Sequence, residues 1–195
     1  MFYNFGPLLY HFQIDEEFRK ELLDRGRQTT IDYRNKLAGH LNKENQYEDE
    51  DIKWFAQKFT PHLTDYVNSY NSFIEQREPK KDLLRVKNLW INFMKAGDFN
   101  PPHIHSGELS FVIYLQVPEL IKLENAESVS NDFGPGSVVF NYGETQDYVL
   151  SERAFMPNER DAFIFNAKLR HHVAPFKSNV ERISVSGNVM WDKEW

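Results

Sequence analysis

Two histidines and a carboxylate, His103, His105 and Glu108, fall within six consecutive residues of the chain. Imidazole and carboxylate together suit Fe, Zn, Mn or Ni. Residues two apart on an extended segment project to the same side, so His103 and His105 can face one point. Further along, His171 and His172 offer a third ligand. Since four of the seven histidines lie in these two short stretches, we favour a bound metal over the alternative of two surface loops that happen to contain histidine.

The segments next to the first histidine stretch have the alternation of strands. Residues 109–117 place leucine, phenylalanine and isoleucine on one face and a more polar set, including Tyr114, on the other. Upstream, residues 83–94 are largely apolar on both faces, which indicates a buried strand. Asn88 and Asn92 share one of those faces. Because a buried amide is costly unless it is hydrogen-bonded, these two predict a polar cavity.

The last predicted strand, 180–191, is polar on one side. Arg182, Ser184, Ser186 and Asn188 share that face, whereas the other face is aliphatic. A guanidinium can bind a carboxylate through two parallel hydrogen bonds, and hydroxyls can complete the anion's hydrogen bonds. A small dicarboxylate reaching from the metal to Arg182 would satisfy the whole set. The alternative is an exposed polar face with Arg182 paired to a surface acid.

The remaining segments predict a mainly β protein with helices at its start. Asp15 can cap a helix over 14–25 that ends at Gly26. A polar loop with a short helical turn over 27–47 follows. Thr60-Pro61 then divides the helical block 49–74 into two helices. Residues 76–82 form a charged connector, further strands are expected at 137–141, 147–150 and 162–166, and 119–136 and 143–160 are expected to be loops. We expect a single domain over 1–195, with helical support over 1–82 and a barrel or sandwich over 83–195.

Composition excludes several classes of protein. A net charge of −6 argues against general nucleic-acid binding, and the absence of cysteine excludes disulfides and thiolate metal sites. The sequence shows neither a signal-peptide pattern nor an apolar run long enough to cross a bilayer. We therefore expect a soluble cytoplasmic protein without a membrane partner, and a homodimer is compatible with the sequence.

Four motifs in order resemble the Fe(II)/2-oxoglutarate-dependent dioxygenases, close to their prolyl-hydroxylase-like branch. That family has a His-X-Asp/Glu motif, a strand with Tyr-Leu, a distal His-X-Val-X-Pro and an Arg-X-Ser. Here the order is His103-Ile104-His105, Tyr114-Leu115, His171-His172-Val173-Ala174-Pro175 and Arg182-Ile183-Ser184. The resemblance covers about residues 85–191 and leaves the helical first third uncovered.

The resemblance implies a double-stranded β-helix (jelly-roll, cupin-like barrel) and an Fe(II) ion bound by His103 and His171. It also implies that Arg182 holds the distal carboxylate of 2-oxoglutarate. The other cosubstrate contacts that we expect are Tyr114, Ser184, Ser186 and Asn92. The sequence departs from the family at one place, because His105 occupies the position of the expected carboxylate. Either His105 is the third metal ligand or Glu108 supplies a carboxylate instead.

The resemblance implies that the enzyme consumes molecular oxygen in the oxidative decarboxylation of 2-oxoglutarate. This step is coupled to hydroxylation of a small-molecule or peptide substrate. The cofactors carry the oxidation, so we expect no catalytic residue beyond their ligands. One rival is a cupin-type metal enzyme that does not use 2-oxoglutarate, since Gly97 followed by His103-X-His105 and Glu108 is similar to the first cupin motif. The other rival is a non-catalytic barrel that binds a small acid.

Overall fold

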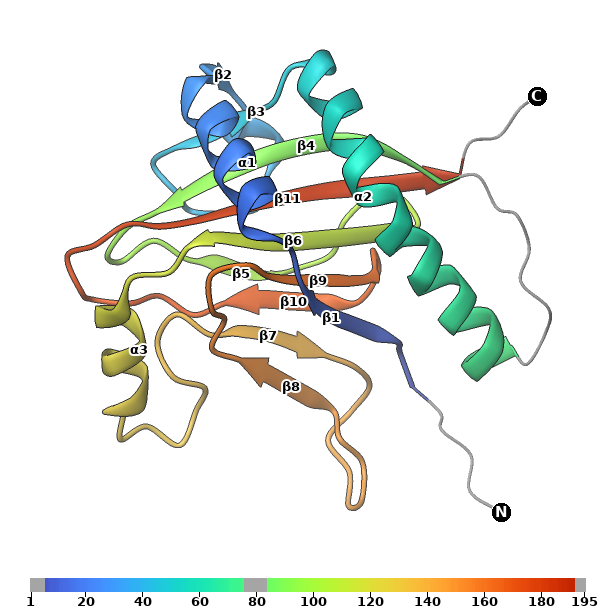
Figure 1. Cartoon of the computed structure of the whole chain (residues 1–195). Coiled ribbons are helices and arrows are strands. Elements are labelled where there is room, and N and C mark those ends of the chain that lie inside the picture. The colour runs from blue at the N-terminus through green and yellow to red at the C-terminus, as the bar shows by residue number, and fades with distance from the viewer. Residues whose placement is uncertain (1–5, 76–83, 192–195) are drawn as a thin grey trace.

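The computed structural model describes residues 6–75 and 84–191 (Figure 1). Its helices and strands, in chain order, are β1 (Leu9–Gln13), α1 (Glu16–Gln28), β2 (Ile31–Asp32), the 3-10 helix η1 (Arg34–Lys36), β3 (Glu44–Gln46), α2 (Asp49–Tyr70), the π-helical turn η2 (Asn71–Glu75), β4 (Leu84–Met94), β5 (Asn100–His103), β6 (Leu109–Gln116), α3 (Glu119–Ala126), β7 (Val138–Asn141), β8 (Glu152–Phe155), β9 (Asp161–Asn166), β10 (Arg170–Val173) and β11 (Arg182–Trp191).

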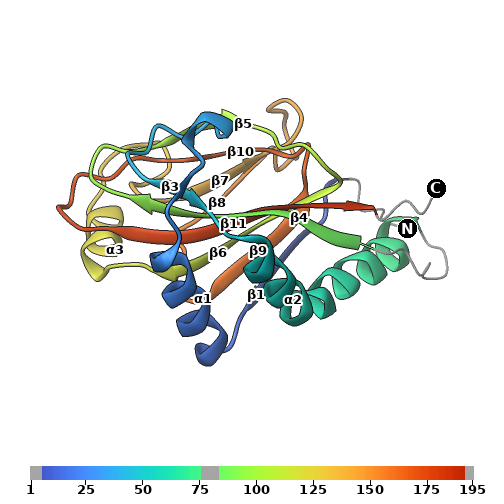
Figure 2. The same ribbon diagram turned by 90° about the horizontal axis from the view of Figure 1, so that it is seen from above.

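Two antiparallel sheets make up the body of the protein. The larger has seven strands in the order β1-β9-β6-β11-β4-β3-β2, and the smaller has four in the order β5-β10-β7-β8. Seen from above, α1 and α2 lie on one side of the larger sheet and the smaller sheet lies on the other (Figure 2). The larger sheet therefore has an outer face covered by helices and an inner face turned towards the smaller sheet.

The outer face is apolar because the central strands alternate as their sequences predict. Leu89 and Ile91 of β4, Phe111 of β6 and Val185 of β11 belong to one buried cluster with the helices. The helices contribute the apolar residues of their inward stripes, which include Phe18, Leu22, Phe55, Phe59 and Leu63. Burial of these side chains at about 25 cal/mol per Å² fixes the helices on the sheet.

A second apolar cluster lies between the two sheets and borders the inner face. Its aromatic members include Phe140 of β7, Phe163 and Phe165 of β9, and Tyr114 of β6. The cluster closes one part of the space between the sheets. The polar residues of β4 and β11 remain on the same inner face, where they line a cavity.

Helix α2 differs from the prediction of two helices, because it continues through Pro61. Proline in a helix interior removes one hydrogen bond and costs roughly 3 kcal/mol. The helix tolerates this cost because Phe55 and Phe59 before the proline and Leu63 and Tyr66 after it are all buried. One stripe thus packs against the sheet on both sides of Pro61.

Helix α1 begins as predicted, with the Asp15 carboxylate accepting a hydrogen bond of 2.7 Å from the Phe18 amide. The predicted stop at Gly26 is wrong, since the helix runs on to Gln28. Gly26 instead allows a close approach, because a Cβ there would collide with the Tyr47 hydroxyl and the Ile91 side chain.

The first third of the chain is not only helical. Strands β1, β2 and β3 join the larger sheet, and β3 pairs directly with β4. The strand expected at 147–150 is found at Glu152–Phe155, and part of the loop expected over 119–136 is helix α3. The predicted connector 76–82 lies outside the described residues. Within residues 6–75 and 84–191, no helix has the length and apolar character needed to cross a membrane.

Candidate metal centre and its cavity

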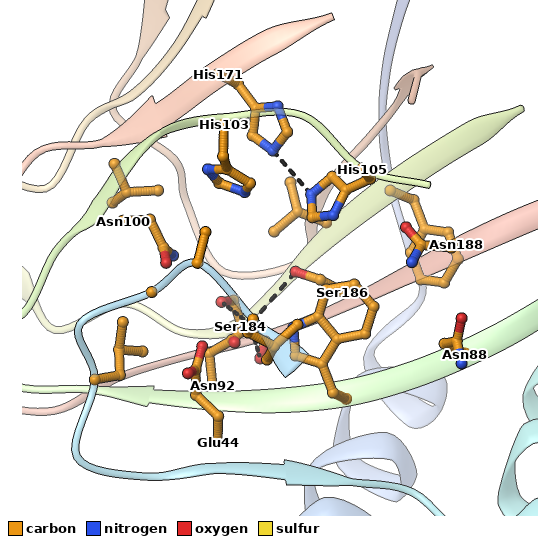
Figure 3. A pocket seen from close by; sticks show the side chains of 18 of the residues that line it. Glu44, Asn88, Asn92, Asn100, His103, His105, His171, Ser184, Ser186 and Asn188 are labelled. Atoms are coloured by element: carbon orange, nitrogen blue, oxygen red, sulfur yellow. Dashed lines mark hydrogen bonds between the residues drawn. The ribbon is translucent and has the colours of Figure 1, made fainter. Parts of the chain in front are cut away.

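Three imidazoles meet on the smaller sheet. His103 ends β5 and is paired in register with His171 of β10, and His105 follows two residues after β5. One ring nitrogen from each of the three lies within 4.8 Å of the others. The Nε2 atoms of His105 and His171 are 3.1 Å apart (Figure 3). Two adjacent nitrogens that are each about 2.1 Å from one ion lie about 3 Å apart, so the separation of His105 and His171 suits two ligands of one metal.

Backbone contacts fix the rings and their tautomers. The Nδ1–H of His103 donates to the Pro101 carbonyl at 2.7 Å, and that of His171 donates to the Leu169 carbonyl at 2.9 Å. A carbonyl can only accept, so both neutral rings carry their proton on Nδ1 and leave the Nε2 lone pair for a metal. Such hydrogen bonds on the second nitrogen are usual for histidine ligands.

His105 is held by its backbone, although it lies outside regular structure. Its amide donates to the Ala167 carbonyl at 2.8 Å, and its own carbonyl accepts from Lys168 Nζ at 3.0 Å. These two contacts tie the segment after β5 to the turn before β10. Both histidine stretches are consequently positioned by one local structure.

Burial keeps the three rings neutral. Removal from water and the neighbouring His171 and His103 rings lower the pKa of His105 to about 3. Burial and the nearby His103 ring lower the pKa of His171 to about 4, and burial also lowers the pKa of His103. A neutral imidazole is the form that ligates a metal. The cluster is therefore ready to bind a cation at pH 7.

The two alternative ligands lie elsewhere. Glu108 is exposed and lines a separate hollow beside Tyr66 and Tyr70 of α2. His172 points away from the other rings, as expected for the residue next to His171 on a strand, and does not line the cavity. The geometry favours His105 over Glu108 and His171 over His172.

A polar row crosses the inner face of the larger sheet opposite the histidines. In register across four neighbouring strands it runs through Tyr114 of β6, Ser184 of β11, Asn92 of β4 and Glu44 of β3. Asn92 Nδ2 lies 3.3 Å from the hydroxyl oxygens of both Ser184 and Ser186. Because those oxygens accept from the amide, each serine keeps its hydroxyl hydrogen for another acceptor.

Arg182 begins β11 and is 2% exposed. Its Nη1 donates to the Gly136 carbonyl and its Nη2 points at the Met94 sulfur, both at 2.8 Å, whereas Nε has no partner. Within the described part of the chain no carboxylate pairs with it, and burial lowers its pKa. A buried guanidinium without an anion is strongly unfavourable, so its environment fits a carboxylate supplied by a ligand. The alternative of a surface ion pair is wrong.

Tyr114 adds a second unsatisfied donor beside Arg182. Its hydroxyl is buried and has no hydrogen-bond partner, and the guanidinium carbon of Arg182 lies 5.4 Å from the ring centre. Burial raises the pKa of Tyr114 to about 12, so the phenol keeps its proton. Both orphaned groups are hydrogen-bond donors, and a carboxylate accepts hydrogen bonds from such groups.

One cavity of about 260 Å³ joins the histidines to this polar face. The residues predicted for the site that line it are His103, His105, His171, Arg182, Tyr114, Ser184, Ser186 and Asn92. Sequence reasoning missed Glu44 and the segment around Leu37, which also line it. Trp90 was predicted only as part of the buried strand. Because Trp90 lies between Asn88 and Asn92 on the same face of that strand, its position in the sequence could have assigned it to the polar cavity.

Comparison with known proteins bears on this arrangement. The model of a family described as "Putative 2OG-Fe(II) oxygenase", where 2OG is 2-oxoglutarate, matches residues 88–188. The chain belongs to this family. The matched segment extends from β4 to β11 and includes all three histidines and Arg182. A search of curated proteins found no match.

Solved structures of 2OG-dependent oxygenases share the fold. A Pseudomonas putida prolyl-4-hydroxylase has a TM-score of 0.59 at 14% identity, over 94% of this chain and 90% of that one. The viral collagen prolyl hydroxylase of Paramecium bursaria Chlorella virus-1, solved with 2OG, has a TM-score of 0.59 at 12% identity, over 93% and 94%. The non-haem α-ketoglutarate-dependent epimerase SnoN of nogalamycin biosynthesis has a TM-score of 0.59 at 12% identity, over 93% and 78%.

These likenesses confirm the predicted double-stranded β-helix of this 2OG-Fe(II) oxygenase. The cofactors of the family are Fe(II) and 2OG. This chain has features that fit both cofactors. Its histidine triad can hold a metal, and its buried guanidinium lacks an anion.

Proposed function

We propose that this 2OG-Fe(II) oxygenase is a dioxygenase that hydroxylates a C–H bond of its substrate. In this proposal the Fe(II) ligands are His103, His105 and His171, and the 2OG contacts are Arg182, Tyr114, Ser184, Ser186 and Asn92. The observation that carries the proposal is the anion-free, fully buried Arg182 in the cavity that also holds the triad.

The bound cofactors supply the oxidising power, with 2OG converted to succinate and carbon dioxide as oxygen is consumed. The protein contributes binding and orientation. Arg182 and Tyr114 hold the far carboxylate of 2OG, while the free hydroxyl hydrogens of Ser184 and Ser186 complete its hydrogen bonds. This contact at one end orients the keto acid towards the imidazoles at the other.

A three-histidine set differs from the His-X-Asp/Glu pattern by one charge. Three neutral imidazoles leave the full charge of the metal uncompensated, whereas a carboxylate would cancel part of it. The anionic cosubstrate is then attracted both by the metal and by Arg182. We therefore expect tighter coupling between metal and 2OG binding than a carboxylate-containing site would give.

The test is titration of the Fe(II)-loaded protein with 2OG under anaerobic conditions, followed by charge-transfer absorbance. Hydrogen bonds to charged groups contribute roughly 1.5–3 kcal/mol each. Arg182→Ala should therefore weaken 2OG binding about a hundredfold. Arg182→Lys keeps the charge but loses the planar fork, and should recover only part of the affinity. Fe(II) binding should be nearly unchanged in both.

Two results would overturn the proposal. A wild-type protein that binds Fe(II) but not 2OG would favour the cupin-type enzyme. Equal 2OG affinity in wild type and Arg182→Ala would place the carboxylate contact elsewhere. With a substrate in hand, a product one oxygen atom heavier than that substrate would distinguish hydroxylation from epimerisation.

A further inference from the structure

Glu44 is a buried acid that neither the metal nor the cosubstrate accounts for. It begins β3, opposite Asn92 of β4, and is 1% exposed. Its side chain reaches towards the same pocket as Asn92 and Ser184 (Figure 3). Its Oε2 has no hydrogen-bond partner, and within residues 6–75 and 84–191 no cation pairs with the carboxyl group.

The charges around Glu44 do not neutralise it. Burial, reinforced by the nearby Asp98, raises the pKa of Glu44 to about 7. Arg34, whose charge lowers the pKa of Glu44, is already held by Asp32 through hydrogen bonds of 2.9 and 2.7 Å. Lys36 also lines the cavity but is exposed. The carboxyl group therefore lacks the cation that would hold it in its ionised form.

A purely structural role does not explain the residue. The backbone carbonyl of Glu44 accepts from the Tyr33 amide at 2.9 Å, and the strand pairing involves backbone groups alone. A glutamine would fill the same space without the cost of a buried charge. An unpaired acid in a cavity is more consistent with a group that meets a ligand.

Two aromatic rings line the same cavity as Glu44. Tyr33 and Trp90 both line the cavity, and their ring centres are 6.0 Å apart. Trp90 is two residues from Asn92 on the inner face of β4 and is paired with Gln46 of β3. Aromatic faces attract cations by roughly 0.5–2 kcal/mol. The cavity thus combines a carboxyl group with two rings whose faces favour positive charge.

We propose that Glu44 determines substrate specificity by binding a positively charged group, an ammonium or a guanidinium, of the molecule that is oxidised. The proposal rests on the function proposed above, because it assigns that site its substrate class. Tyr114 and Glu44 stand at the two ends of the polar row, three strand spacings or about 14 Å apart along the sheet. Arg182 attracts the anionic cosubstrate to one end, and Glu44 attracts the cationic substrate to the other.

The experiment compares blocked amino acids that differ in one charge. The probes are Nα-acetyl-lysine methylamide against its Nε-acetylated form, and Nα-acetyl-arginine methylamide against the citrulline analogue. Each is titrated by calorimetry into anaerobic protein loaded with Fe(II) and 2OG. We expect at least one cationic probe to bind about tenfold more tightly than its neutral partner. Glu44→Gln should reduce that ratio to about one, and Glu44→Asp should keep part of it.

Glu108→Gln is the matched control, because it removes an exposed carboxylate outside the cavity and should leave the ratio unchanged. Equal binding of both charged probes and their neutral partners to wild type, or an unaltered ratio in Glu44→Gln, would overturn the proposal. Fe(II) and 2OG binding are measured first in the same samples. Their failure in wild type would contradict the proposed function, and the probe comparison repeated without cofactors would still test Glu44.

Discussion

The two faces of β4, β6 and β11 come from the same strands and have opposite character. Towards α1 and α2 they present aliphatic and aromatic side chains that are almost completely buried. Towards the smaller sheet the same strands present Arg182, Tyr114, Asn92 and two serines. Two orphaned polar atoms, Arg182 Nε and Tyr114 Oη, lie on the inner face of these strands.

One face of the sheet thus contributes mainly to stability, and the other face contributes mainly to ligand binding. The outer face gains free energy by removing apolar surface from water, whereas the inner face loses some by burying polar groups without partners. We infer that the helices offset the cost of keeping a polar cavity open. Substitutions on the outer face should therefore alter unfolding, and substitutions on the inner face should alter ligand binding.

The largest effect is expected at the histidines. His171→Ala and His105→Gln should abolish measurable Fe(II) binding, because each removes one of the three proposed ligands. His172→Ala and Glu108→Gln should retain it, since neither residue lines the cavity. Anaerobic calorimetric titration with Fe(II) compares the four variants. Intact affinity in His105→Gln with loss in Glu108→Gln would transfer the third ligand to the carboxylate.

On the outer face, Phe55→Ala should lower the free energy of unfolding by about 3–5 kcal/mol. Phe55 is 0% exposed, and its ring centre lies 4.8 Å from that of Phe59 and 5.2 Å from that of Phe111. Urea unfolding measures the loss, and Fe(II) affinity of the folded variant should match wild type. Ser186→Ala, on the inner face of the sheet, should change stability by less than about 1 kcal/mol. Similar losses of unfolding free energy in Phe55→Ala and Ser186→Ala would contradict the inference that the outer face determines stability and the inner face determines ligand binding.

Glu44 makes the inner face sensitive to pH. The unfolded chain loses the Glu44 proton near pH 4.5, whereas the folded protein keeps it to about pH 7. The folded state binds more protons in this window, so its stability falls as the pH rises through it, by up to about 3 kcal/mol. Glu44→Gln removes this contribution and should be more stable than wild type above pH 7, with little difference below pH 4.5. Parallel stability profiles from denaturant unfolding at pH 4.5, 6 and 8 would contradict this.

The smallest effect is expected for Tyr114→Phe. This change should have opposite effects on the stability of the protein and on its affinity for 2OG. Without ligand the change removes a buried hydroxyl that has no partner, so the free energy of unfolding should stay the same or rise. With Fe(II) bound, the affinity for 2OG should fall by roughly tenfold, because one hydrogen bond to the carboxylate is lost. A stability loss above about 1 kcal/mol with unchanged 2OG affinity would make Tyr114 a structural residue.

The strands around the cavity could be predicted because a buried sheet with one polar face leaves a period of two in the sequence. Ser184 and Ser186 alternate with Ile183 and Val185, and the structure places the two pairs on opposite faces. The spacing of His103 and His105 likewise predicted that both rings face one point, whereas the choice of His171 as their partner came from the family resemblance. These signals are local, since each depends on neighbours along one segment.

The rest depended on contacts between distant segments. Strand β3 has three residues in a polar stretch, too few to show a period, and it is a strand only because β4 lies beside it. Because β3 is so short, the sequence also did not indicate that Glu44 lines the cavity. Pro61 misled the helix assignment because the apolar stripe of α2, not its local sequence, keeps that helix continuous.

The position of β3 bears on how this protein could acquire new substrates. Only the two-residue strand β2 lies beyond β3 in the larger sheet, and the proposed metal and cosubstrate contacts lie outside β3. Exchanging the residue at position 44, or the covering segment around Leu37, leaves the oxidising centre and the helix-packed face in place. The margin of the sheet is therefore where directed evolution for altered selectivity should begin.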